Sequence, residues 1–188
     1  PRRQHYGRQR SARDRPVRTV RPMGRVELTS WASTQRIGID GTVDSEQRVT
    51  LDRPVVDCSD RGARELASRY WAELQRSGRR LISVRDHAGG IDLRLLGFRP
   101  VLIALGPVET AYSPASASAR HPIRGGLLVR RSGGSIAFEQ IVGERVELRS
   151  RIDGFHPRRG PFYVLVQRRF HLALSRRYFR RLIGGDPP

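Results

Sequence analysis

Residues 161–183, PFYVLVQRRFHLALSRRYFRRLI, are the longest stretch with helical periodicity, and they predict a long C-terminal helix. Pro161 suits its first turn, and Gly184-Gly185 suits its end. With about 3.6 residues per turn, one stripe of this helix carries Val164, Gln167, His171, Leu174, Tyr178 and Leu182. The opposite side carries Arg169, Arg176, Arg177, Arg180 and Arg181. The apolar stripe therefore needs a second layer of structure to cover it.

A second amphipathic helix is predicted at residues 61–76. Ser59 and Asp60 can cap its first turn, and Gly78 fits its end. Its apolar positions recur at helical spacing: Ala63, Leu66, Ala67, Tyr70, Trp71 and Leu74. The aromatic residues on this face are expected in a core or along a pocket.

Most of the remaining chain predicts short strands joined by turns. Residues 23–57 show short strands with a turn at Asp40-Gly41, and later strands are expected near 80–86, 91–96, 99–104, 107–113, 126–131, 135–142 and 144–151. In the last of these, Val146, Leu148 and Ser150 alternate with Glu147, Arg149 and Arg151, which is typical of an antiparallel sheet with one wet face. The small, polar stretch 113–121 predicts a flexible loop or an edge.

These elements predict an α+β fold, in which a curved antiparallel sheet of about seven strands wraps around the C-terminal helix. We expect a single domain at residues 23–184 and a short tail at 185–188. Residues 1–22 hold eight arginines and one acid without apolar periodicity, and they predict a disordered extension. Met23, the only methionine, is the expected natural start. The alternative is that residues 1–22 form a basic arm that binds RNA or DNA.

All 36 basic side chains are arginine, and the net charge is +18. A protein selected for phosphate binding normally uses lysine as well, so the absence of lysine favours a GC-rich, bacterial genome as the main cause. The excess charge lies at the two ends of the chain, whereas residues 23–150 are close to balanced. The alternative, selection for phosphate binding, depends on where the arginines lie in the fold.

The sequence contains no signal for a disulfide, a membrane span, a metal site or a nucleotide-binding motif. Cys58 is the only cysteine, so no intramolecular disulfide can form, and the chain fits a reducing compartment. The longest strongly apolar run, residues 101–105, is too short to cross a membrane, and a soluble cytoplasmic protein is expected. No histidine pair has metal-ligand spacing on a helix, and no nucleotide-binding or nucleophile motif occurs. We therefore expect no metal and no cofactor.

The order of elements resembles the helix-grip superfamily, which includes START lipid-transfer domains, polyketide cyclases and the pollen-allergen family. The resemblance covers about residues 46–183. It rests on that order, on the segments 125–131 (GGLLVRR) and 145–152 (RVELRSRI), and on the helix 161–183. The superfamily commonly has two short helices between its first two strands, where this chain predicts one. The resemblance implies a cavity between the sheet and the C-terminal helix that binds an apolar small molecule, either a lipid or a polyketide-like compound. Some members carry out cyclase, aromatase or hydrolase chemistry in that cavity.

The polar residues on the apolar stripe are the best candidates for a site. Gln167 and His171 lie one helical turn apart there, and in a cavity protein they would orient the ligand. The predicted cavity residues are Gln167, His171, Leu174, Tyr178, Trp71 and Phe138. The alternative is that the polar ones only bond backbone groups of the sheet. An enzyme on this fold would use His171 or His156 as its acid or base.

The arginine face of the C-terminal helix supports a rival function. Its side chains, Arg169, Arg176, Arg177, Arg180 and Arg181, are suited to the phosphates of RNA or DNA or to an anionic membrane surface. The alternative is a solvated helix face that is built of arginine because the genome favours it. The oligomeric state is left open by the sequence.

Overall fold

The computed structural model describes residues 26, 28–78, 81–95, 100–158 and 161–184, and the side chains of the last helix from residue 170 onward. Its two helices, α1 (Asp60–Ser77) and α2 (Pro161–Gly184), agree with the predicted ranges to within one residue at each end. The predicted extension 1–22 and the predicted tail 185–188 lie outside the described residues.

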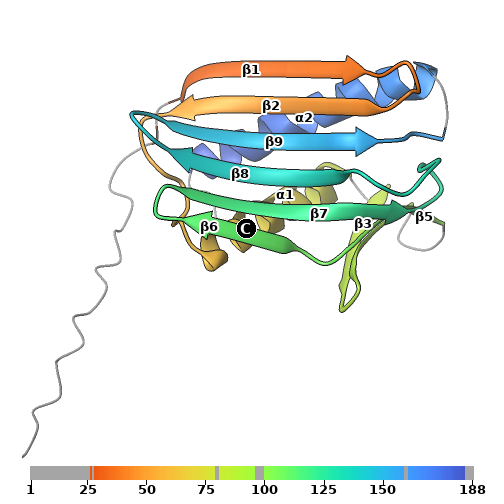
Figure 1. The fold of residues 1–188 in the computed structure, drawn as a ribbon, viewed down its shortest axis with the longest axis horizontal. Helices are drawn as coiled ribbons and strands as arrows, with labels where there is room; N and C mark the ends of the chain where they lie inside the picture. Colours follow the sequence, from red (N-terminus) through yellow and green to blue (C-terminus); the bar gives the residue numbers. More distant parts are fainter. Residues whose placement is uncertain (1–25, 27, 79–80, 96–99, 159–160, 185–188) are drawn as a thin grey trace, which may run out of the picture.

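Nine strands in the described part of the chain form one antiparallel sheet. In chain order they are β1 (Leu28–Ile37), β2 (Val43–Leu51), β3 (Ile82–His87), β4 (Gly90–Leu95), β5 (Val101–Leu105), β6 (Glu109–Ser113), β7 (Ser116–Gly125), β8 (Ser135–Val142) and β9 (Val146–Phe155). Their order across the sheet is β1-β2-β9-β8-β7-β5-β4-β3, and β6 pairs with β7. The early strand β2 therefore pairs with the late strand β9, which joins the two ends of the domain (Figure 1).

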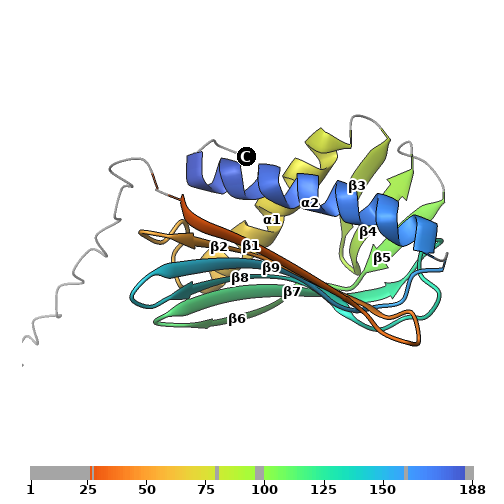
Figure 2. The ribbon, with the colours of Figure 1, turned by 90° about the horizontal axis from the view of Figure 1, so that it is seen from above.

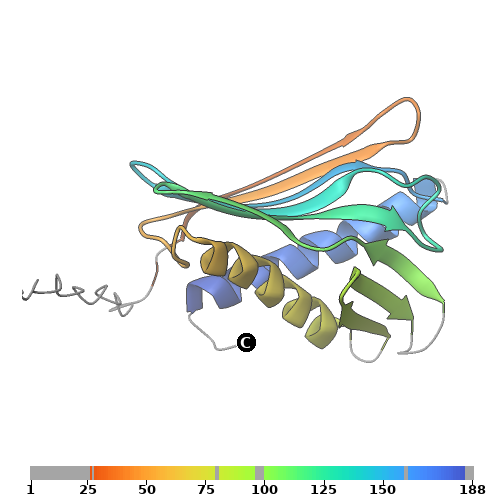
Figure 3. The ribbon, with the colours of Figure 1, turned by 60° about the horizontal axis from the view of Figure 1, so that its bottom comes forward.

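Both helices lie on the same face of the sheet (Figures 2 and 3). α1 packs against β7, β8 and α2, and α2 also contacts β2. The end of the sheet that contains β3, β4 and β5 bends toward the helices (Figure 3). The sheet thus wraps around a helical layer, which confirms the predicted α+β fold class and is consistent with a helix-grip fold.

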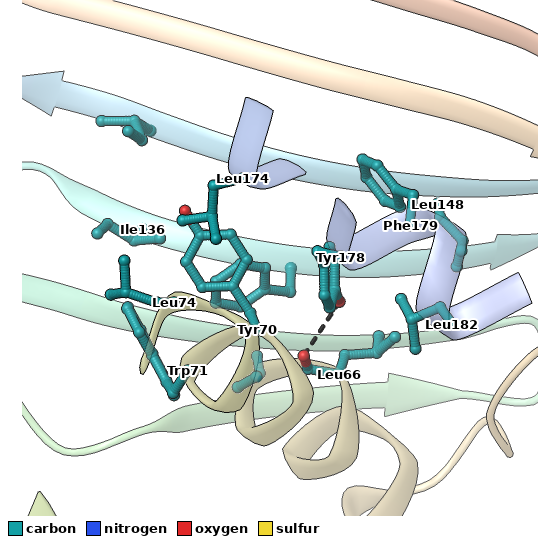
Figure 4. Packing of buried hydrophobic residues seen from close by; sticks show 14 of the residues in the cluster. Leu66, Tyr70, Trp71, Leu74, Ile136, Leu148, Leu174, Tyr178, Phe179 and Leu182 are labelled. Atoms are coloured by element: carbon teal, nitrogen blue, oxygen red, sulfur yellow. Dashed lines mark hydrogen bonds between the residues drawn. The ribbon is translucent and has the colours of Figure 1, made fainter. Parts of the chain in front are cut away.

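Strand alternation builds the core between these layers. In β9, Val146, Leu148 and Ser150 are buried as predicted, while Arg149 on the other side of the strand bonds Glu147 at 2.6 Å. α2 adds Tyr178, Phe179 and Leu182, which interleave with Leu66 and Tyr70 of α1 over the strands (Figure 4). One sheet face is therefore apolar and covered, and the opposite face carries ion pairs.

The segment that enters α1 is fastened to the sheet. Ser59 caps the helix as predicted, accepting a hydrogen bond from the backbone nitrogen of Gly62 at 3.1 Å. Before it, the fully buried amide of Gln140 on β8 accepts from the nitrogens of Val55 and Val56 at 2.9 and 3.2 Å and donates to the Val56 carbonyl at 2.8 Å. One side chain thus satisfies three backbone groups and sets where α1 begins.

β7 corrects two predictions. The sequence predicts a loop or an edge at 113–121 and a strand at 126–131. The strand lies instead at Ser116–Gly125, and residues 126–131 form a turn and bends with one isolated bridge from Val129 to Pro157. Its covered face is made partly of Ala117 and Ala119, both 0% exposed beneath the helical layer. Small side chains let a helix approach a sheet closely, a tertiary requirement that local hydrophobicity does not display. β1 and β2 also join the sheet, so the described strands number nine where about seven were predicted.

Candidate functional site

The two helices and the bent end of the sheet border an apolar pocket of about 220 Å³. Its lining comprises Tyr70, Trp71 and Leu74 of α1, Phe170, His171 and Leu174 of α2, and Ile82, Leu93, Leu102, Ile103, Leu128, Ile136 and Ile152 from the strands and the turn after β7. Phe170 is exposed and marks the side of the pocket nearest the solvent. The polar side-chain atoms of the described lining belong to the tyrosine, the tryptophan and the histidine.

His171 is paired on one side of its ring. Its Nδ1 lies 3.2 Å from the hydroxyl oxygen of Tyr70, whereas the buried Nε2 has no hydrogen-bond partner among the described residues. Burial lowers the pKa of His171 to about 4, because desolvation penalises the charged ring. Burial also raises the pKa of the Tyr70 hydroxyl. Both side chains are therefore neutral near neutral pH.

Trp71 is positioned by a hydrogen bond to His121 of β7. The indole Nε1–H of Trp71 donates to His121 Nε2 at 3.2 Å, and His121 Nδ1 lies 3.1 Å from the Gly106 carbonyl oxygen. His121 therefore carries its proton on Nδ1 and uses both ring nitrogens. Desolvation lowers the pKa of His121, which keeps the ring neutral. The residue lies in the strand that the sequence did not predict, so its role was missed.

The predicted cavity residues divide between the pocket and the core. His171, Leu174 and Trp71 line the pocket. Phe138 and Tyr178 lie in the packed core, where the Tyr178 hydroxyl donates to the Leu66 carbonyl at 3.0 Å (Figure 4). The side chain of the sixth, Gln167, lies outside the described residues. Contact between any of them and a ligand stays a prediction.

Tyr70 is the functional candidate that sequence reasoning missed. It lies on the apolar face of α1, where a tyrosine reads as an ordinary core residue. Its partner His171 is 101 positions further along the chain, so only the packing of α1 against α2 brings the two together. A pair of this kind leaves no local signal in the sequence.

His156, the second candidate acid or base, is not part of the described pocket lining. Arg131 Nη2 donates to its Nε2 at 2.9 Å, and its Nδ1 lies 3.2 Å from Thr42 Oγ1. Thr42 in turn donates to Asp40 at 2.6 Å, and hydrogen bonds from Thr42 lower the pKa of that carboxyl. The network ties the β1–β2 turn to the end of β9, which is a structural role.

The described arginines of α2 have two different surroundings. Arg181 pairs with the buried carboxylate of Glu73 on α1 at 2.7 Å, and Arg177 donates to Ser77 at 3.3 Å. Arg176 instead lies over the ring of Trp31 on β1, with its guanidinium carbon 5.8 Å from the ring centroid. The side chain of Arg169 lies outside the described residues.

A cleft between α1 and α2 collects part of this charge. It measures about 400 Å³ and is lined by Glu73, Arg76, Ser77, Arg177, Arg180 and Arg181. Four guanidinium groups therefore face one carboxylate, and no described carboxylate pairs with Arg177 or Arg180. The cleft is distinct from the apolar pocket, which contains none of these residues.

The described residues contain neither a metal-binding cluster nor a membrane-spanning helix. No three His, Cys, Asp or Glu side chains lie together there as a metal site requires. Neither described helix has the length and apolar character needed to cross a membrane. Cys58 lies 3.9 Å from the Gln140 amide nitrogen, beside the segment that enters α1.

Known proteins resemble this chain only in structure. No protein-family model and no curated protein matches it. The solution NMR structure of CalU16 from Micromonospora echinospora has 15% identity and a TM-score of 0.39, covering 89% of this chain and 80% of CalU16. The crystal structure of CalU16 has 14% identity and a TM-score of 0.36, covering 84% of this chain and 85% of CalU16. Similarity at this level leaves the function to be inferred from the residues of this chain.

Proposed function

We propose that this protein binds one small, predominantly apolar molecule in the pocket between α1, α2 and the sheet. The observation that carries the proposal is the pocket itself, about 220 Å³ lined by apolar side chains from both layers. Ligand sites are typically concave and mostly apolar, with a few polar groups that orient the ligand. Because a cavity of about 150 Å³ accepts benzene, this pocket suits a molecule of about ten carbon atoms, such as a small ring system or a short lipid chain.

Native mass spectrometry of the purified protein tests this proposal directly. A co-purified molecule should appear as an added mass on the wild type. Ile136→Phe places a larger side chain into the pocket from β8 and should remove that mass. The control is Ile37→Phe, the same substitution at an exposed position at the end of β1.

The natural ligand could be lost during purification, so a second test uses an added probe. Tetralin, a bicyclic hydrocarbon with ten carbons, is a suitable probe for a pocket of this size. Calorimetric titration should show binding to the wild type and to Ile37→Phe and much weaker binding to Ile136→Phe. Binding to none of the three proteins, or equal binding to all of them, would contradict a ligand site in this pocket.

Acid–base catalysis, as in a cyclase or aromatase, is the less favoured use of this pocket. An active site needs several polar groups that converge on the substrate. Here Tyr70 and His171 bond each other, and Trp71 bonds His121. With its pKa lowered to about 4, His171 is unprotonated near neutral pH and a poor general acid there. An enzyme would be favoured over a binding protein only if the wild type converts a bound probe to product and His171→Phe does not.

The cleft between α1 and α2 supports a second candidate function, the binding of an anionic group. Four guanidinium groups against one carboxylate make the cleft strongly positive, and phosphate is the group that such arginines bind best. RNA, DNA and an anionic membrane surface all present phosphates. Binding of this kind weakens steeply as salt concentration rises.

Matched charge variants separate a specific cleft from general positive charge. Arg177→Ser with Arg180→Ser removes two cleft arginines, and Arg36→Ser with Arg145→Ser removes two exposed arginines elsewhere. Binding to an RNA oligonucleotide and to phosphatidylglycerol vesicles is measured over a salt series. The cleft pair should lose binding to one of these probes and the control pair should retain it. Equal losses in both pairs, or no binding at low salt, would reject the cleft.

A further inference from the structure

His171 lines the pocket and His121 contacts the lining residue Trp71, and these two buried histidines differ in how their ring nitrogens are satisfied. His121 uses both nitrogens, one toward Trp71 and one toward the Gly106 carbonyl. His171 uses only Nδ1, which meets the Tyr70 hydroxyl, and its Nε2 has no partner in the described structure. His171 is 8% exposed and lines the pocket. A buried, unpartnered polar atom in an apolar ligand site calls for an explanation.

Hydrogen-bond counting decides where the proton of His171 lies. If the Tyr70 hydroxyl donates to Nδ1, the ring proton is on Nε2, and one group, that N–H, lacks a partner. If Nδ1–H donated to the Tyr70 oxygen instead, both the hydroxyl proton and the Nε2 lone pair would be unsatisfied. Each buried unsatisfied group is unfavourable, so the first arrangement is preferred. Tyr70 therefore acts as a positioning residue that makes Nε2–H a hydrogen-bond donor.

We infer that His171 Nε2–H donates a hydrogen bond to an oxygen of the bound molecule, which is therefore an apolar compound that carries a neutral carbonyl group. The inference rests on the proposed function of the pocket and specifies its ligand class. A carbonyl oxygen offers the acceptor that the donor lacks. A carboxylate fits less well, because no described side chain of the lining carries a positive charge at neutral pH to compensate a buried anion.

A matched pair of probes isolates this hydrogen bond. Tetralin and 1-tetralone share one ring skeleton, and in the second a carbonyl replaces one methylene. Their affinities also differ because water solvates the ketone better, so the informative quantity is the ratio of the two Kd values in each protein. Comparison of that ratio between wild type and His171→Phe cancels the solvation difference.

The ratio should favour 1-tetralone about tenfold more in the wild type than in His171→Phe, because one hydrogen bond is lost in the variant. His171→Gln, whose amide N–H can replace the Nε2–H donor, should recover part of that preference. The control His87→Phe, at an exposed histidine of the β3–β4 hairpin outside the pocket lining, should keep the wild-type ratio.

The failures of the two proposals are distinguishable. Tetralin bound by the wild type with an unchanged ratio in His171→Phe would overturn the carbonyl inference and leave the apolar ligand site standing. Binding of neither probe to the wild type would overturn both.

NMR of the unsubstituted protein tests the proton position without any variant. A long-range ¹H–¹⁵N spectrum should place the His171 proton on Nε2, and added 1-tetralone should shift that nitrogen more than tetralin does. A proton on Nδ1 would overturn the inference.

Discussion

Filling the pocket with tetralin should stabilise the folded protein by an amount that follows from the pocket volume. Buried cavities destabilise proteins by about 24 cal/mol per Å³. A ligand that fills a pocket of about 220 Å³ can therefore gain up to about 5 kcal/mol of binding free energy. This corresponds to a Kd on the order of 0.1–1 mM. The full binding energy, with a Kd near 0.1 mM, applies to a ligand that contacts the whole lining. A ligand that contacts only part of the lining should have a Kd closer to about 1 mM.

Urea denaturation at increasing tetralin concentration measures this stabilisation. At free tetralin three times its Kd, the free energy of unfolding should rise by about 0.8 kcal/mol. Ile136→Phe removes part of the volume and should show a smaller rise at the same concentration. No rise in the wild type up to the solubility limit of tetralin, or an equal rise in the variant, would refute the argument from volume.

Three further predictions concern the framework around the pocket. The folded-state pKa of His171, about 4, lies below the usual 6.5, so the unfolded chain binds the proton first as pH falls. The stability that depends on the neutral ring is present above about pH 6.5 and decreases toward pH 4. Between pH 7 and pH 4.5, the free energy of unfolding measured in urea should fall by about 2 kcal/mol more in the wild type than in His171→Phe. Equal losses in the two proteins would be inconsistent with a lowered pKa of His171. Gln140→Leu leaves three backbone groups before α1 without their partner and should lower the free energy of unfolding by about 3 kcal/mol, whereas a loss below about 1 kcal/mol in urea would indicate that water replaces the amide. Ala119→Leu overpacks β7 beneath the helical layer and should lower that free energy by about 1–3 kcal/mol. Ser118→Leu, at a half-buried position on the opposite face of the same strand, should have a smaller effect, and similar losses in both would argue against close packing beneath the helices.

Local periodicity predicted the elements that bury one regular face. Helix α2 was predicted to within one residue, and strand β9 was predicted although it ends four residues beyond the expected 144–151, because their apolar positions recur at about 3.6 and 2 residues. β7 was missed because its buried residues include Ala117 and Ala119, which are only weakly hydrophobic. Small side chains are needed at these positions because a helix packs over them, and the local sequence does not reveal that contact. His171 was predicted on the covered stripe, but its pairing with Tyr70 was not, since the pair depends on how two distant helices pack.

The arginine face was predicted as one surface and proves to be divided. Arg176 contacts Trp31 on the β1 side, while Arg177 and Arg181 contact α1 on the other. A helical projection shows which residues leave the core, but it cannot show which neighbour each of them meets. Part of the positive charge on this face is therefore used in contacts within the fold.

Helix α1 takes part in both candidate sites, because Tyr70 contacts His171 in the pocket and Glu73, less than one turn later, holds Arg181 in the cleft. A displacement of this helix would alter the two sites together. Thermodynamic linkage then requires reciprocity: if an anion in the cleft changes the affinity for the apolar ligand by some factor, the ligand changes the affinity for the anion by the same factor. If both proposed sites bind, α1 is the element through which an anion in the cleft and a ligand in the pocket would change each other's affinity.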